Sequence, residues 1–317
     1  MYSFNREEYE KRTAWFKEAR FGMFIHFGLY AIPARGEWVR STEEMSKEEY
    51  MKYFYEFNPV NYDPKAWAKA AKEAGMQYVV MTAKHHDGFC LFDSQYTDFK
   101  STNTPIGRDL VKEFVEAVRG EGLKVGLYFT LLDWYHEDYP HYGDRIHPMR
   151  NNENEKNDHR DFNRYLDYMH KQIREICTNY GKLDLLWFDF SYDDMRGEKW
   201  RATELIDMVR TLQPGVIIDN RLEVSGEGYG SLASGNPTPY HGDFVTPEQT
   251  TNAAFTAALA RRYHARLTVK LPTVFFRLFY GEGAVLLTEG QCVKPTRLLE
   301  KEFQFQAPTV EAFFKRI

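Results

Sequence analysis

Residues 183–189, Leu-Asp-Leu-Leu-Trp-Phe-Asp, form an almost wholly apolar run that ends in a carboxylate. The run follows a helical pattern over residues 161–180 and a break at Gly181, so it predicts a strand buried on both faces of a parallel sheet. Asp189 then lies at the carboxyl end of this strand. Loops at that edge of α/β sheets and barrels frame a cleft, so Asp189 is a candidate catalytic group, with a capping or turn residue as the alternative.

The same order of helix, glycine and buried strand recurs along the chain. It is clearest over residues 62–82, where Asp63 and Pro64 begin a helix, Gly75 ends it and an apolar strand follows. Further copies cover residues 108–130, 161–189 and 198–219, and an earlier strand covers residues 21–27. Alternating strands and helices require parallel strands, and five or six such units favour a (β/α)8 TIM-like barrel over an open doubly wound sheet. About six strands are recognisable, so we expect the barrel to be incomplete.

Composition argues against several classes of function. The chain has 317 residues, 43% of them apolar, and a net charge of -5 with no long basic run in its first 250 residues, so we expect no nucleic-acid partner. No apolar stretch approaches the roughly 20 residues that cross a bilayer, and the charged residues 1–17 lack a secretory signal. We therefore expect a cytoplasmic protein without a membrane partner. Cys90, Cys177 and Cys292 are scattered, which favours reduced thiols over a disulfide framework.

Polar side chains recur at the carboxyl ends of the expected strands. They are His26 after the first strand, His85-His86-Asp87 after the second, Tyr128 and Asp133-Trp134 on and after the third, Asp189 at the fourth, and Asn220-Arg221 after the fifth. Because these ends meet at one edge of a parallel sheet, the five sets predict an active site there. His85 and His86 cannot both face inward on a regular strand, since side chains alternate. They must lie on a loop or bulge, or only one of them reaches the site.

With these residues, the chain resembles the α-L-fucosidases of glycoside hydrolase family 29. The matching segments span about the first 250 residues in family order and are WFKEARFGMFIHFG (15–28), GEW (36–38), AKHHDGF (83–89), 126–134, 185–190 and 219–221. The resemblance implies a (β/α) barrel followed by a β-sandwich. It also implies retaining hydrolysis of terminal α-L-fucose from a fucosylated glycan or a small fucoside, without a cofactor or a metal.

The resemblance implies a role for each matched residue. The nucleophile is Asp189, and an ionised carboxylate among apolar neighbours suits attack on an anomeric carbon. The implied substrate ligands are His26, Glu37, Trp38, His85, His86, Tyr128, Trp187 and Arg221. Neutral imidazoles suit this work because each offers one donor and one acceptor to neighbouring hydroxyls. Structural alternatives stay open: barrel filling for Tyr128 and Trp187, a solvated loop acid for Glu37, and a core position for His26.

A retaining site also needs a second carboxyl about 5 Å from the nucleophile, to protonate the leaving oxygen. Some family members resemble this chain over residues 242–248, and there Glu248 is the candidate acid/base. Other members use a Trp-Glu element further along, and no match to that element follows Thr250.

From Thr251 onward the resemblance stops and the composition changes. Residues 251–317 contain no Asp and no Trp, and they carry ten Lys and Arg against five Glu. We therefore expect a barrel catalytic domain over residues 1–250, a divergent, frameshifted or disordered tail over residues 251–317, and no C-terminal β-sandwich. A frameshift or spurious fusion near Thr251 is the favoured interpretation, and a divergent true domain is the alternative. A barrel without its last two strands leaves edges unpaired, so we expect poor solubility or impaired activity.

Two other functions fit the same residues. A non-catalytic fucose-binding remnant would keep the sugar pocket but lack its acid. A metal-dependent barrel hydrolase would use His26, His85, His86 and Asp189 as zinc ligands, and metal content separates it from a fucosidase.

Overall fold

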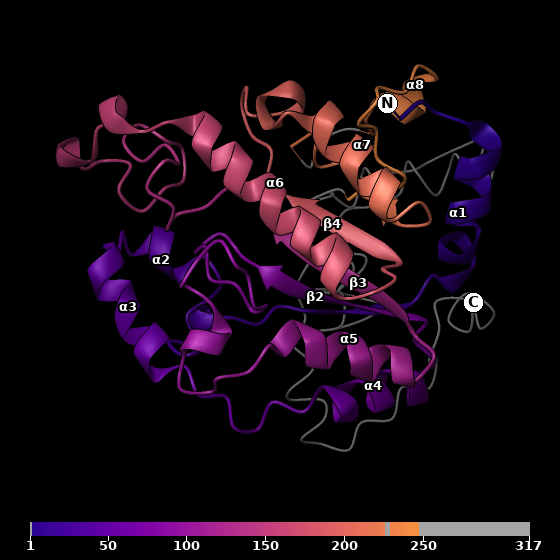
Figure 1. Cartoon of the computed structure of the whole chain (residues 1–317), viewed down its shortest axis with the longest axis horizontal. Helices are drawn as coiled ribbons and strands as arrows, with labels where there is room; N and C mark the ends of the chain where they lie inside the picture. Colours follow the sequence, from indigo (N-terminus) through magenta and orange to yellow (C-terminus); the bar gives the residue numbers. More distant parts are fainter. Residues whose placement is uncertain (1, 226–228, 247–317) are drawn as a thin grey trace, which may run out of the picture. The chain divides into compact units, whose positions relative to one another are not determined.

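The computed structural model describes residues 2–225 and 229–246, which form an α/β fold (Figure 1). The strands are β1 (Gly22–Ile25), β2 (Tyr78–Lys84), β3 (Lys124–Thr130), β4 (Leu185–Asp189) and β5 (Ile217–Ile218). The α-helices are α1 (Arg6–Ala19), α2 (Val39–Thr42), α3 (Lys47–Glu56), α4 (Pro64–Glu73), α5 (Leu110–Gly120), α6 (Phe162–Asn179), α7 (Ala202–Leu212) and α8 (Ser231–Ser234). Short 3-10 helices are η1 (Leu29–Ala31), η2 (Ser101–Asn103), η3 (Glu153–Glu155), η4 (Asn157–His159) and η5 (Gly197–Trp200).

The five strands form one parallel sheet in the order β1-β2-β3-β4-β5. Each strand lies beside its neighbour in the sequence, which is the winding of a (β/α) barrel and confirms the predicted fold class. Beyond β5, Asp219 makes a single parallel bridge with Phe244, at the place of a sixth strand. The predicted count of about six strands therefore corresponds to five strands and this bridge. No β-sandwich occurs among the described residues, and the predicted tail lies outside them.

Three helices, α4, α5 and α6, begin where the sequence places an aspartate cap. Asp63 accepts a hydrogen bond from the Ala66 backbone N–H at 3.0 Å, and Pro64 occupies the first position of α4. Asp109 and Asp161 cap α5 and α6 in the same way. These caps fix the points at which the chain turns into each outer helix, and α4, α5, α6 and α7 flank the sheet (Figure 1).

The two faces of the sheet bury different sets of side chains. One face carries most of the hydrophobic core. The other carries a smaller cluster built on Val80, Tyr128, Leu185 and Ile217, against which Trp187 packs half-buried. Since strand residues alternate between faces, Tyr128 and Trp187 share the face that also carries Asp189.

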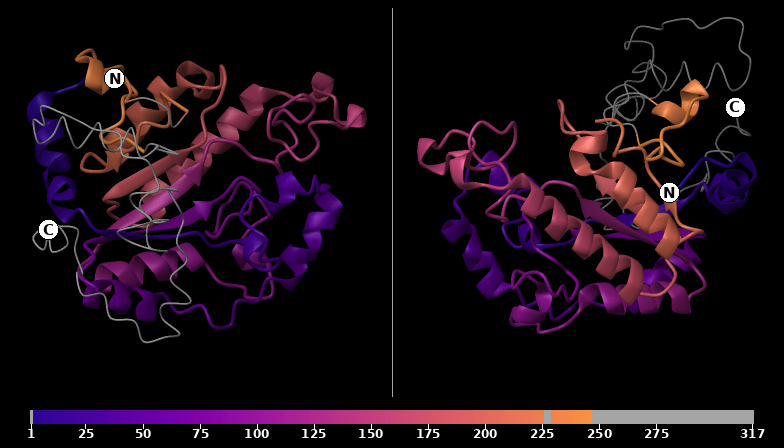
Figure 2. Two further views of the ribbon diagram at one scale, coloured as in Figure 1. Left: turned by 180° about the vertical axis from the view of Figure 1, so that it is seen from behind. Right: turned by 45° about the horizontal axis from the view of Figure 1, so that its top comes forward.

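The segment that follows β5 is held against the first helix and against α7. Asp243 accepts hydrogen bonds from Arg12 of α1 at 2.8 Å and from Arg210 of α7 at 2.6 Å, and all three side chains are almost fully buried. Its Oδ2 also accepts the Ile218 backbone N–H at 3.0 Å. Figures 1 and 2 show the N-terminal residues beside this orange segment. None of the described helices is long and apolar enough to cross a membrane.

Candidate active site

Asp189 ends β4 and is 8% exposed. Its Oδ2 accepts a hydrogen bond from the Tyr128 hydroxyl at 2.9 Å, and its Oδ1 lies 3.4 Å from Arg221 Nη1. His86 Nε2 lies 3.9 Å from Oδ2. Burial and the charge of Asp189 raise the pKa of Tyr128, so its hydroxyl stays protonated and donates a hydrogen bond to the carboxylate. The structure thus surrounds Asp189 with three of the residues predicted from the sequence.

Both histidines that follow β2 reach this site. The pairing of β2 with β3 shifts register between Thr82 and Lys84, which frees the next residues from strict alternation. The rings of His85 and His86 then lie 4.2 Å apart between centroids, and His85 lies 5.4 Å from His26. His86 Nδ1 lies 2.7 Å from the hydroxyl of Thr130. Of the two possibilities left open by the sequence, the loop or bulge is correct.

The three imidazoles are neutral at neutral pH. Burial lowers the pKa of His85 well below its ordinary value and that of His86 to about 3. The neighbouring imidazoles disfavour a second proton in the cluster, and the charge of Arg221 adds to this effect at His86. The pKa of His26 is lowered by desolvation, and the charge of Glu37 partly opposes this shift. By surface area His26 is exposed. His85 Nδ1 is buried and has no hydrogen-bond partner among the described residues. This atom is therefore available to a hydroxyl.

Aromatic rings lie beside His86 and His26. Trp38 is half-buried, and its ring lies 5.1 Å from His86 and 5.4 Å from Phe190, the residue after Asp189. Near His26, Trp187 packs edge-on against Phe24 at 5.1 Å, and Phe24 stacks on the His26 ring at 4.9 Å. Glu37 precedes Trp38 and is exposed. Flat rings beside neutral donors and acceptors suit a sugar, whose C–H face stacks while its hydroxyls form hydrogen bonds.

Arg221 connects Asp189 to the end of the described chain. Its Nε donates to Thr246 Oγ1 at 2.7 Å and its Nη2 to the Thr246 carbonyl at 2.9 Å, and the side chain is 2% exposed. Glu248, the candidate acid/base, lies outside the described residues. Its role stays a prediction.

Some strand-end residues point away from Asp189. Asp87 accepts a hydrogen bond from the Tyr50 hydroxyl at 2.8 Å, and Asp133 pairs with Lys84. These two carboxylates are therefore engaged by Tyr50 and Lys84, away from Asp189.

Two neighbours of the site were not singled out from the sequence. Thr130 is paired in register with Asp189 and contacts His86. Asp219 is fully buried, and its Oδ1 accepts the Phe188 backbone N–H at 3.1 Å. Burial and the charge of Asp189 raise its pKa, against the opposing charge of Arg221. Asp219 belongs to the segment 219–221 that resembles the family, and its position at the end of an expected strand could have identified it as a neighbour of the site.

The part of the chain that the structure describes contains no group of three or more His, Cys, Asp or Glu placed to hold a metal ion. Of the four residues considered as zinc ligands, His86 contacts both Thr130 and Asp189, while His85 lies in ring contact with His26 and His86.

Comparison with known proteins gives two family matches. A family model described as Alpha-L-fucosidase matches residues 1–257. The match ends seven residues after Thr250, where the sequence predicts the end of the catalytic domain. A second, described as a domain of unknown function (DUF1731), matches residues 271–317.

Individual relatives agree with the first match. An α-L-fucosidase of Dictyostelium discoideum is 28% identical over 234 residues, which are 65% of this chain and 48% of that protein. The solved α-L-fucosidase isoenzyme 1 from Paenibacillus thiaminolyticus is 68% identical with a TM-score of 0.68, over 68% of this chain and 51% of that one. AlfC from Lactobacillus casei, solved with its α-L-fucose product, is 34% identical with a TM-score of 0.60, over 67% of this chain and 71% of that one.

The chain thus spans about half the length of the first two of these relatives. The strand order, the carboxylate at the end of β4 and the family match over more than three quarters of the sequence lead to one assignment. The chain belongs to the α-L-fucosidase family.

Proposed function

We propose that this chain releases terminal α-L-fucose from glycans or small fucosides, with Asp189 as the nucleophile of a retaining reaction. The observation that carries the proposal is the setting of Asp189, whose two oxygens are held by Tyr128 at 2.9 Å and Arg221 at 3.4 Å. A carboxylate fixed on both oxygens keeps one defined orientation toward the cleft. Structural neighbours in the family bind matching ligands, since AlfC mutants were solved with Fuca(1,6)GlcNAc and with 4-nitrophenyl-α-L-fucopyranoside.

In the first step an Asp189 oxygen forms a bond to C1 of fucose while the bond from C1 to the leaving oxygen breaks. The leaving oxygen takes a proton from a general acid, for which Glu248 is our candidate. In the second step the same group removes a proton from water, whose oxygen displaces Asp189 from C1 and restores the free carboxylate. Asp219 is fully buried with one oxygen bound to the Phe188 N–H, so we assign it to supporting β4.

The imidazoles and aromatic rings would hold the sugar. His26, His85 and His86 are neutral, so each can donate to one hydroxyl and accept from another. The unpartnered Nδ1 of His85 favours a hydrogen bond to the ligand. Trp38 would pack against an apolar face of the deoxysugar, and Glu37 would contribute from the exposed side.

Hydrolysis of 4-nitrophenyl α-L-fucoside tests the proposal, because an aryl leaving group needs little protonation and isolates the role of Asp189. A 2-fluoro-fucosyl fluoride should label Asp189 in the purified chain, as found by peptide mass spectrometry. Asp189→Asn is the matched control and should take no label. Labelling at another residue, or full turnover by Asp189→Asn, would refute the nucleophile assignment.

Fucose binding without turnover is a second candidate. It is favoured by the match of residues 271–317 to a different family and by the position of Glu248 close to the end of the fucosidase match. Calorimetry would then show fucose binding by a chain that neither hydrolyses the aryl fucoside nor takes the label.

A further inference from the structure

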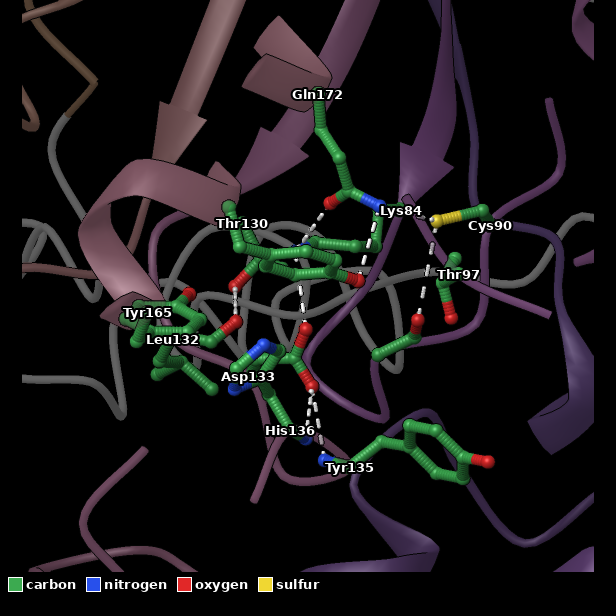
Figure 3. A network of polar contacts seen from close by, with 12 residues as sticks. Lys84, Cys90, Thr97, Thr130, Leu132, Asp133, Tyr135, His136, Tyr165 and Gln172 are labelled. Atoms are coloured by element: carbon green, nitrogen blue, oxygen red, sulfur yellow. Dashed lines mark hydrogen bonds and ion pairs between the residues drawn. The ribbon is translucent and has the colours of Figure 1, made fainter. Parts of the chain in front are cut away.

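A buried ion pair behind the histidines plays no part in the proposed reaction. The ammonium of Lys84, the last residue of β2, lies 3.0 Å from Asp133 Oδ2 and 3.1 Å from Gln172 Oε1 of α6 (Figure 3). The Lys84 and Asp133 side chains are at most 1% exposed. Two charges so deep in a protein carry a large desolvation penalty, so their retention calls for an explanation beyond general stability.

The Asp133 carboxylate organises the loop that leaves β3. Its Oδ1 accepts the backbone N–H groups of Tyr135 at 2.8 Å and His136 at 3.0 Å, as Figure 3 shows. Burial raises the pKa of Asp133, but Lys84 and the neighbouring donors outweigh it and bring the pKa below its ordinary value. The carboxylate is therefore ionised, and it holds this turn through charge-assisted hydrogen bonds.

The same turn holds the backbone of His86. Trp134, the residue after Asp133, donates its backbone N–H to the His86 carbonyl at 2.8 Å. Two residues after His86, Gly88 has a φ of +84° and passes so close to Asp133 that a Cβ would lie 2.3 Å from Oδ1. Asp133 and its turn therefore contact the backbone at His86 and again at Gly88.

We propose that Lys84 and Asp133 are positioning residues, which set the His86 ring against Thr130 and Asp189 without touching the substrate. Lys84 anchors the end of β2 to α6 through Gln172 and to the β3 loop through Asp133. In this position His86 Nδ1 lies 2.7 Å from the Thr130 hydroxyl and His86 Nε2 lies 3.9 Å from Asp189 Oδ2. The consequence for turnover rests on the proposed function, whereas the placement of the ring does not.

The test replaces both charges at once, with Lys84→Met and Asp133→Asn in one chain. Removing the pair together avoids leaving one buried charge uncompensated, and the Asn side-chain oxygen can still accept the two backbone N–H groups. NMR of the 15N-histidine-labelled full chain gives the pKa of His86, and circular dichroism with thermal unfolding reports the fold. We expect a folded double variant in which the pKa of His86 rises by more than one unit from a wild-type value near 3. We also expect kcat on 4-nitrophenyl α-L-fucoside to fall at least tenfold, with a smaller change in KM.

A second ion pair provides the matched control. Arg164 of α6 pairs with Asp138 of the same β3 loop at 2.7 Å, and no hydrogen bond or ion pair joins either of them to the histidine pair. Arg164→Met with Asp138→Asn should leave the pKa of His86 unchanged.

A folded Lys84→Met and Asp133→Asn variant with an unaltered His86 pKa would overturn the proposal. So would failure of that variant to fold, since the pair would then serve folding as such. Absence of turnover in the wild type would count against the proposed function alone, because the NMR measurement needs no reaction.

Discussion

The hydroxyl of Tyr128 donates a hydrogen bond to the carboxylate of the candidate nucleophile at 2.9 Å. Tyr128→Phe removes this donor and keeps the ring that packs inside the sheet. A hydrogen bond to a charged group contributes about 1.5–3 kcal/mol, so we expect kcat/KM on an aryl fucoside to fall by about one to two orders of magnitude. The melting temperature should change little, and an unchanged kcat/KM would show that the hydroxyl does not help Asp189.

His86 should also make stability depend on pH. Its pKa is about 3 in the folded chain and about 6.5 when unfolded, so between these values the unfolded state binds the extra proton. Folding therefore loses stability as the pH falls through this range. For His86 alone we expect the loss to reach about 3 kcal/mol at pH 4.

Urea unfolding at pH 7 and pH 4 measures this loss. His86→Asn serves as the comparison, because an amide does not titrate and the difference between the two proteins isolates the imidazole. Equal pH dependence in both proteins would contradict the assigned protonation state.

At the scale of single elements, the caps offer a simple test. Asp63 is exposed and accepts the Ala66 N–H at the start of α4, so Asp63→Ala should lower the free energy of unfolding by about 1 kcal/mol. The nearby exposed substitution Lys65→Ala should change it by less than about 0.5 kcal/mol. Chemical denaturation at neutral pH measures both changes in the free energy of unfolding. Equal effects of the two substitutions would show that the Asp63 cap does not stabilise α4.

The elements differ in how well their sequence predicts them. Asp63 and Pro64 start helix α4 and Gly75 follows its end, and each acts on the backbone next to it, so this helix could be located from local chemistry. The register shift on β2 arises from its pairing with β3, so the sequence of β2 alone does not predict it. The site follows the same division. Asp189 could be predicted because it is a charge at the end of an apolar strand. The roles of Thr130 and of the Lys84–Asp133 pair could not, because they depend on contacts with residues distant in sequence.

For the whole molecule, the described sheet has β1 and β5 as its outer strands, and β5 is only two residues long. We predict that the purified 317-residue chain is poorly soluble, or that the fucose release proposed above is impaired on natural glycans. Size-exclusion chromatography and glycan hydrolysis measure both properties, and a soluble monomer with robust release would contradict the prediction. Reading the adjacent frames of the gene past Thr251 tests the frameshift interpretation, since no fucosidase-like Trp-Glu segment in any frame would count against it.

The carboxylate of Asp243 joins Arg12 to a position 231 residues later in the chain. During synthesis on the ribosome, α1 emerges first but waits for nearly the whole barrel region before its charge partner exists. Helix α1 is therefore made first but forms its ion pair with Asp243 late. Contacts this distant in sequence slow folding. A nascent chain halted before Asp243 would leave Arg12 facing solvent.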